Sequence, residues 1–207
     1  MDDSHRIISV QKLYEDAKYL LEKIVMGSAD ELIDSLEQGV AILKSSWEGS
    51  DAVTQINNVI DVTNAMIAIR NVLGNLAVDA AKIANVYREV QIANKGNNLS
   101  SLDLLRFDTK SMLERLPVDP NKSDSININP EVNNGKQKVT AASDAIQNFV
   151  TGAKSYMDAI MENWTAGPGR KNAQDAFDEF FSKSDQYKKT LQEVSTSIGT
   201  AIQNYTF

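Results

Sequence analysis

The sequence predicts an all-α protein built from two long antiparallel helical hairpins and a connector between them. Apolar residues recur at alternating spacings of three and four along most of the chain, which is the periodicity of a helix with one buried face. Only four prolines and ten glycines occur in 207 residues, a composition that favours long uninterrupted helices over turn-rich β structure. The order of long helix, tight turn and long helix occurs twice, so two hairpins are expected.

The first hairpin is expected over residues 1–94. The apolar stripe of its first helix extends over residues 10–47 and is interrupted at Gly27-Ser28, where we expect a kink or a short break. Ser28 and Glu31 have the spacing of a capping box, in which two side chains satisfy the first N–H groups of a helix.

The turn of this hairpin is expected at Trp47-Glu48-Gly49-Ser50-Asp51. Gly49 is suited to stop the first helix, and the Ser50 side chain is suited to cap the second. The second helix is expected from about residue 51 to residue 94, with a small slip of its apolar register near residues 62–63. A helix of this length extends about 60 Å and needs an equally long partner, which the preceding helix supplies by folding back.

The connector is expected over residues 95–135. Ser100 or Ser101 is placed to cap a short amphipathic helix, and Pro117 is placed to end it. The apolar positions of that helix are Leu102, Leu105, Met112, Leu113 and Leu116. The remaining residues up to 135 are rich in Asn, Ser, Asp and Pro, which predicts an irregular segment.

The second hairpin is expected over residues 136–207. Its first helix carries an apolar stripe from residue 139 to residue 164, and a turn follows at Trp164-Thr165-Ala166-Gly167-Pro168-Gly169. Pro168 is well placed to occupy the first position of the last helix.

The two hairpins align with each other in layout more than in identity. An offset of 117 residues pairs Trp47 with Trp164, and an offset of 118 beyond the register slip pairs Tyr87 with Tyr205. We interpret this as an internal repeat. The alternative is that any two helices of heptad-like pattern can be aligned in this way.

Composition argues against several classes of function. The chain has 28 Asp and Glu against 21 Lys and Arg, a net charge of −7, whereas nucleic-acid binding requires a surplus of cations. The absence of cysteine excludes disulfides, thiolate metal sites and cysteine nucleophiles, and the single histidine, His5, cannot build a triad or a multi-histidine metal site. The sequence holds no phosphate loop, nucleophile elbow or zincin motif, so we expect no enzyme activity, no cofactor and no metal.

The start of the chain does not have the pattern of a Sec signal peptide. Residues 1–6 are acidic in character and no apolar run follows them. No window approaches the roughly 18 apolar residues that span a bilayer. We therefore expect a soluble protein without a membrane partner, which leaves the cell, if at all, without a cleavable leader.

Trp47-Glu48-Gly49, placed between two long helices, resembles the motif of the Trp-X-Gly (WXG) family. Members of this family are small helical hairpins that bacterial type VII (ESX) secretion systems export. The opening residues 8–13 are also similar to that family, and the resemblance covers about residues 8–94 and 136–207. The second turn departs from the motif, because Trp164-Thr165-Ala166-Gly167 has its glycine one position later.

The resemblance implies an intramolecular four-helix bundle. Family members pair two hairpins into such a bundle, so two hairpins in one chain imply a pseudo-dimer; exchange of hairpins with a second copy, giving a homodimer, is the competing arrangement. The turn residues Trp47, Gly49, Trp164 and Gly167 are those that the resemblance assigns to recognition by the secretion machinery.

The family's export signal is a tyrosine followed four residues later by Asp or Glu. Tyr87 and Tyr205 are the candidates here, but Gln91 follows Tyr87 at that spacing and only two residues follow Tyr205. The protein is therefore expected to be either a non-enzymatic exported substrate or effector, or a cytosolic chaperone or targeting partner of a larger LXG-type toxin. A membrane-active helical protein is the third reading, and the acidic surface argues against it.

Overall fold

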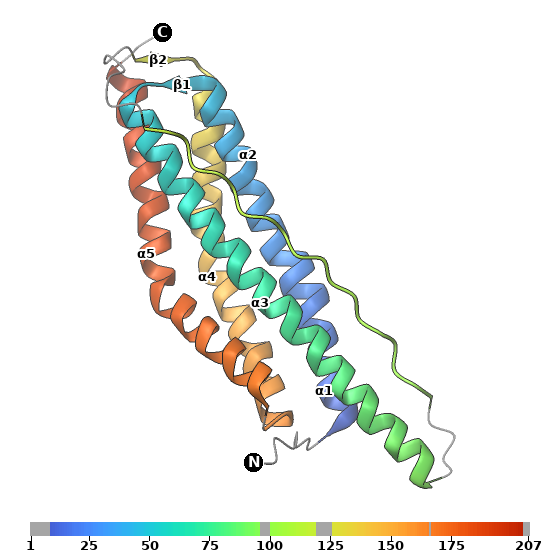
Figure 1. Cartoon of the computed structure of the whole chain (residues 1–207). Coiled ribbons are helices and arrows are strands. Elements are labelled where there is room, and N and C mark those ends of the chain that lie inside the picture. Colours follow the sequence, from blue (N-terminus) through green and yellow to red (C-terminus); the bar gives the residue numbers. More distant parts are fainter. Residues whose placement is uncertain (1–8, 96–99, 119–125, 166, 205–207) are drawn as a thin grey trace. The chain divides into compact units, whose positions relative to one another are not determined.

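The computed structural model of the chain describes residues 9–95, 100–118, 126–165 and 167–204. It confirms the all-α class (Figure 1). The elements are, in order, α1 (Val10–Tyr19), the π-helix η1 (Leu20–Ala29), α2 (Asp30–Ser46), β1 (Trp47–Glu48), α3 (Ser50–Lys95), β2 (Asn127–Ile128), α4 (Val132–Asn163) and α5 (Pro168–Asn204).

The chain forms two compact units. The first unit comprises Met1–Ala29, Ile69–Lys110 and Phe149–Phe181, and the second comprises Asp30–Ala68, Ser111–Asn148 and Ser182–Phe207. This division differs from the hairpin boundaries that the sequence predicts, because each unit takes segments from both expected hairpins and from the connector.

At Gly27-Ser28, where the sequence predicts a kink or a short break, the chain does not break but leaves α-helical geometry for the wider π turns of η1. The buried residues Ile24 and Ala29 are five positions apart, a spacing that a π-helix, with its i→i+5 hydrogen bonds, brings to one face. Ser28 caps no helix. Its hydroxyl donates instead to the Ile24 carbonyl over 3.3 Å.

The second helix of the first hairpin is one continuous helix, α3, as expected. It begins at Ser50, and the main-chain carbonyl of Gly49 accepts the first helical hydrogen bond, from the Val53 N–H over 3.1 Å. The capping position is therefore occupied by Gly49, and the expected role of the Ser50 side chain is wrong.

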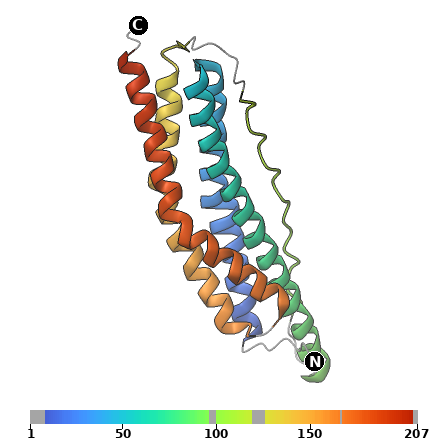
Figure 2. The same ribbon diagram turned by 60° about the vertical axis from the view of Figure 1, so that its left-hand side comes forward.

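The short helix expected in the connector is also wrong. Residues 100–118, which we call the strap, have no regular secondary structure and lie beside α3, as Figures 1 and 2 show from two directions. Asparagine side chains of α3 hydrogen-bond the main chain of the strap, for example between Asn64 and Leu113. These contacts satisfy main-chain groups that a helix would have satisfied internally.

Helix α4 begins at Val132, within the segment that was expected to be irregular. The Asn129 side chain accepts from the Glu131 N–H, and the Asn129 carbonyl accepts from the Val132 N–H. Gly135 is part of this helix and lies close to α2, where an added Cβ would come 2.8 Å from the Leu43 side chain.

The first unit buries an aromatic core. Phe149 of α4 meets Phe180 of α5 edge to face, with ring centroids 5.9 Å apart. Tyr19 of α1 stacks on Tyr156 of α4 at 6.2 Å, where the Tyr19 ring is half exposed. Contact between η1 and α4 requires Gly152, since a Cβ there would lie 2.9 Å from Ile24.

The second unit packs α2 against α4 and α4 against α5. A Cβ added at Gly39 of α2 would already lie 3.3 Å from the Lys138 side chain of α4. Thr140 of α4 and Ser195 of α5 share a hydroxyl hydrogen bond of 2.8 Å. The buried apolar side chains between these helices include Ile33, Leu36, Leu43, Val139, Ile146, Leu191, Val194 and Ile198.

Candidate functional site

The turn at Trp47 lies in the second unit and joins α2 to α3. The last residue of α2, Ser46, is buried, and its hydroxyl donates to the Ile42 carbonyl four residues earlier over 2.7 Å. Trp47 pairs with Ile128 in the antiparallel β1–β2 bridge, and its side chain is 4% exposed. Gly49 has φ 125°, a backbone conformation that L side chains rarely adopt.

The turn at Trp164 lies in the first unit and joins α4 to α5. The last residue of α4, Asn163, is buried, and its side-chain amide donates to the Ala159 carbonyl four residues earlier over 3.0 Å. Trp164 is 1% exposed. Gly167 has φ 142°, and its carbonyl accepts from the Lys171 N–H over 3.3 Å.

The two turns therefore share one construction. A buried polar residue bonds back to the helix it ends, a buried tryptophan follows it, and a glycine of positive φ then offers its carbonyl to the first turn of the next helix. Pro168 is the first residue of α5, as expected. The expectation that Trp47 and Trp164 are core side chains at hairpin tips agrees with their burial.

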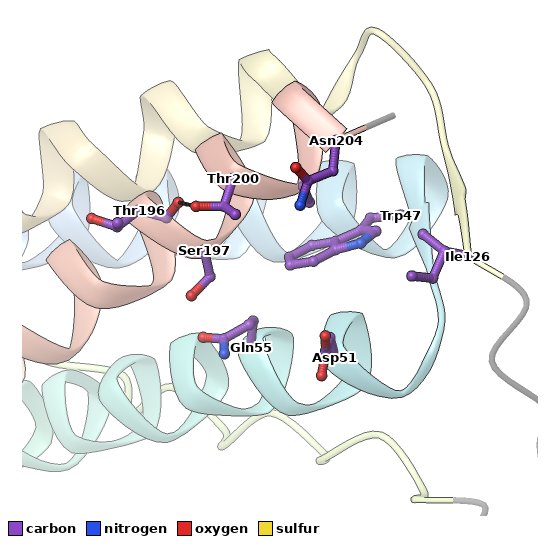
Figure 3. A pocket seen from close by; sticks show the side chains of 9 residues that line it. Trp47, Asp51, Gln55, Ile126, Thr196, Ser197, Thr200 and Asn204 are labelled. Carbon is purple, nitrogen blue, oxygen red and sulfur yellow. Dashed lines mark hydrogen bonds between the residues drawn. The ribbon is translucent and has the colours of Figure 1, made fainter. Parts of the chain in front are cut away.

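A polar hollow of about 360 Å³ lies beside Trp47 within the second unit. Figure 3 shows the indole ring extending between side chains of α5 and side chains of α3. The lining consists of Trp47, Asp51, Gln55, Ile126, Thr196, Ser197, Thr200, Ala201 and Asn204. One carboxylate, two amides and three hydroxyls in this wall can hydrogen-bond a small polar group, with the indole as the apolar side.

An acidic side chain lies beside the second turn. The Asn163 amide nitrogen lies 3.5 Å from a carboxylate oxygen of Asp16 on α1. Burial raises the pKa of the Asp16 carboxyl above its ordinary value, and the nearby Glu15 and Glu162 act in the same direction against the attraction of Lys12.

Of the two tyrosines that are candidates for an export signal, Tyr87 lies within the described residues. Tyr87 is half buried on α3, and Gln91, four residues later, is also half buried. Tyr205 lies outside the described residues. A functional role for either tyrosine stays a prediction.

The described ranges contain no group of three or more His, Cys, Asp or Glu side chains placed to hold a metal ion. Among the helices in those ranges, none is long and apolar enough to cross a membrane.

Comparison with known protein families, with characterised proteins and with solved structures finds no match to this chain. The turn geometry and the sequence resemblance are therefore the observations on which a functional proposal rests.

Sequence reasoning missed the polar residues that close the helices before each tryptophan. Ser46 and Asn163 are related by the same 117-residue offset as the tryptophans, which was the available signal. The asparagines that hold the strap were missed as well, although Asn57, Asn64 and Asn71 are spaced by seven along α3.

Proposed function

We propose that the chain is a tandem WXG-like protein that is exported by, or serves, a bacterial type VII secretion system. It acts through protein–protein contacts rather than catalysis. The observation that carries the proposal is the shared construction of the two turns, each with a buried tryptophan and a positive-φ glycine that starts the next helix. This geometry supports treating Trp164–Gly167 as a second WXG-like turn despite its later glycine.

The pseudo-dimer is part of this proposal. Each compact unit draws helices from both expected hairpins, and the second unit has close contacts between α2 and α4 at Gly39 and Gly135. These contacts favour two hairpins that bury their apolar stripes against each other within one chain. The covalent connection replaces a bimolecular association by a local concentration of about millimolar order.

Fractionation of the source bacterium tests the export. An epitope-tagged chain is expected in the culture medium of the wild-type strain and in the cytosol of a strain without the secretion ATPase, with a cytosolic enzyme as the control for lysis. Equal release by the two strains contradicts the proposal. Variants Gly49→Ala and Gly167→Ala are expected to reduce export, whereas Gly199→Ala, inside α5, is the matched control that leaves it unchanged.

One observation favours the alternative of a cytosolic chaperone or targeting partner of an LXG-type toxin. In the first unit, Tyr19 and Met26 are 49% and 56% exposed, and they are seven residues apart along the first helical stretch. Both side chains offer exposed apolar surface to a partner helix, although the π turns of η1 between them do not keep the one-face spacing of an α-helix. Size-exclusion chromatography with light scattering separates the readings, because a chaperone forms a defined complex with its co-expressed toxin and a self-contained effector elutes as a monomer.

A further inference from the structure

Asparagine side chains of α3 hydrogen-bond the main chain of the strap. In the second unit, the Asn64 amide donates to the Leu113 carbonyl over 3.0 Å, and the Asn64 carbonyl oxygen accepts from the Leu113 N–H over 2.7 Å. Asn57 makes the same pair of bonds with Leu116. An asparagine side chain offers one donor and one acceptor group, so it can satisfy both main-chain groups of one strap residue. We call such a contact between an asparagine of α3 and the main chain of the strap a rung.

The first unit carries the same type of rung. Asn71 donates to the Lys110 carbonyl over 2.9 Å and accepts from the Lys110 N–H over 3.0 Å. Further along α3, Asn85 accepts from the Leu102 N–H over 3.1 Å. In the second unit, Asn57 and Asn64 are seven residues apart and meet Leu116 and Leu113, three apart, because seven helical residues rise about 10.5 Å and three extended residues about 10 Å.

A socket for one aromatic ring lies beside the rungs of the first unit. The Arg70 guanidinium sits 4.5 Å from the centre of the Phe107 ring and donates to the Asp108 carbonyl over 2.6 Å. The ring lies against Gly74, where any Cβ would collide with it. Arg70 is only 6% exposed, so the guanidinium is held in place on α3 as one wall of the socket.

We propose that α3 in the first unit is a binding site for an extended peptide that carries one aromatic residue, and that strap residues 100–110 are its intramolecular occupant. The rungs at Asn71 and Asn85 engage main-chain groups, which every sequence offers. Leu102 and Leu105 of the strap are half buried as Phe107 is, and the strongest side-chain selection is expected at the socket formed by Arg70 and Gly74. A partner segment of the same chemistry binds by displacing the strap.

The remaining strap contacts are suited to exchange. Leu104 is 68% exposed, and the strap has no regular secondary structure of its own. The Arg88 guanidinium bonds the Ser100 carbonyl, again a main-chain group, over 3.3 Å at an exposed position. Release of strap residues 100–110 therefore requires the loss of main-chain hydrogen bonds, including one between Tyr14 of α1 and Asp103, and of the Phe107 ring contact, while the helices stay folded.

Binding in trans tests the site. The full chain is prepared with residues 100–110 replaced by a Gly/Ser linker of equal length, and its helicity is checked by circular dichroism. A fluorescein-labelled peptide of residues 100–110 is titrated into it and fluorescence anisotropy is recorded. We expect saturable binding that weakens at least about tenfold when the peptide carries Phe107→Ala or the protein carries Gly74→Val. A peptide that keeps Phe107 and has its other side chains scrambled is expected to bind within about threefold.

Matched controls make the result decisive. Gly199→Val, at a helical glycine of α5 where an added Cβ meets only the Lys136 side chain, is expected to leave peptide binding unchanged. Absence of saturable binding to a helical linker variant overturns the proposal. Equal binding of the Phe107→Ala peptide overturns it too.

A second measurement uses the unmodified chain and does not depend on the linker variant. The tethered strap has an effective concentration of about millimolar order, so unlabelled peptide is added at several millimolar. Amide hydrogen exchange of Leu102 and Lys110, whose N–H groups bond to asparagines, is expected to accelerate at least about tenfold, while exchange in the helices stays slow. Unchanged exchange of these two amides contradicts displacement.

Discussion

The two tryptophan turns are built alike but are closed to different degrees. Trp164 is 1% exposed, and its ring lies near Gly169 in the first turn of α5. Trp47 is 4% exposed and borders a polar hollow of about 360 Å³ that α3 and α5 line with hydrogen-bonding side chains. The indole of Trp47 therefore forms part of the wall of this hollow, and the indole of Trp164 is almost completely buried.

The comparison distinguishes the features that both turns share from the hollow described beside Trp47. Both turns need a polar closing residue, a buried ring and a positive-φ glycine, since these features occur twice. At the Trp47 turn the ring also borders the hollow, and Trp47 and Glu48 pair with β2. Under the proposed function, recognition by a partner is expected to depend more on the Trp47 turn, and stability more on the Trp164 turn.

Truncation of the rings has the largest expected effect. Trp164→Ala is expected to lower the free energy of unfolding by about 3–5 kcal/mol, because it leaves a cavity in a closed core. Trp47→Ala is expected to cost less, since part of its ring already faces the hollow. Urea unfolding followed by circular dichroism measures both. An equal or larger loss for Trp47→Ala contradicts the comparison.

Single-tryptophan variants supply the control. Trp164→Phe leaves only Trp47, and Trp47→Phe leaves only Trp164. The fluorescence of Trp47 is expected to be quenched more strongly by acrylamide than that of Trp164, because small molecules can reach the hollow.

Alanine at the two turn glycines has the next largest effect. Gly49→Ala and Gly167→Ala are each expected to lower the free energy of unfolding by about 1–3 kcal/mol, because a Cβ is strained at φ 125° and 142°. Gly199→Ala, inside α5, is the control and is expected to be neutral or to stabilise by up to about 1 kcal/mol. Thermal unfolding measures the loss of stability for each variant. If the losses for Gly49→Ala and Gly167→Ala differ by nearly the whole expected range, the two turns do not share one construction.

Removal of the closing polar side chains has a smaller effect. Ser46→Ala and Asn163→Ala are each expected to cost about 1 kcal/mol, the net value of one hydrogen bond. Asn163→Ala is expected to cost more, because Asn163 also meets the Asp16 carboxylate. Urea unfolding midpoints measured at one pH check this ranking. A larger loss of stability for Ser46→Ala than for Asn163→Ala contradicts it.

The smallest effect is a dependence on pH at the Trp164 turn. The raised pKa of Asp16 means that the folded state holds its proton more tightly than the unfolded state does. Ionised Asp16 therefore destabilises the fold above its raised pKa, and this penalty disappears as the pH falls through that pKa towards the ordinary value. Asp16→Asn keeps an acceptor oxygen for Asn163 and is expected to melt at a higher temperature than the wild type at pH 7.

Melting curves of the two proteins between pH 7 and pH 4 test this sign. The advantage of Asp16→Asn is expected to shrink with falling pH, and an advantage that does not change contradicts the assignment. Asp158→Asn is the control. Asp158 is exposed, and its replacement removes the 2.9 Å ion pair with Lys154, so this variant is expected to melt at a slightly lower temperature than the wild type at pH 7.

Much of the helical architecture could be predicted because its signals are local. The spacing of apolar residues predicted α3 as one helix, and Pro168 predicted the first residue of α5. The burial of Trp47 and Trp164 was predicted from their place at the turns between long expected helices. The roles of Ser46 and Asn163 were not predicted, because their shared 117-residue offset marks equivalent positions but does not indicate which main-chain groups their side chains bond.

The sequence by itself determined the helices and the two tryptophan turns, since periodicity, glycine and proline act within a few residues. Only the tertiary structure decided the form of the strap. Its leucines fit a helix equally well in isolation, but Asn57, Asn64 and Asn71 bind its main chain in an extended form and the socket at Gly74 accepts Phe107. Those partners are 33 to 59 residues away along the chain, so no local pattern of the strap records them.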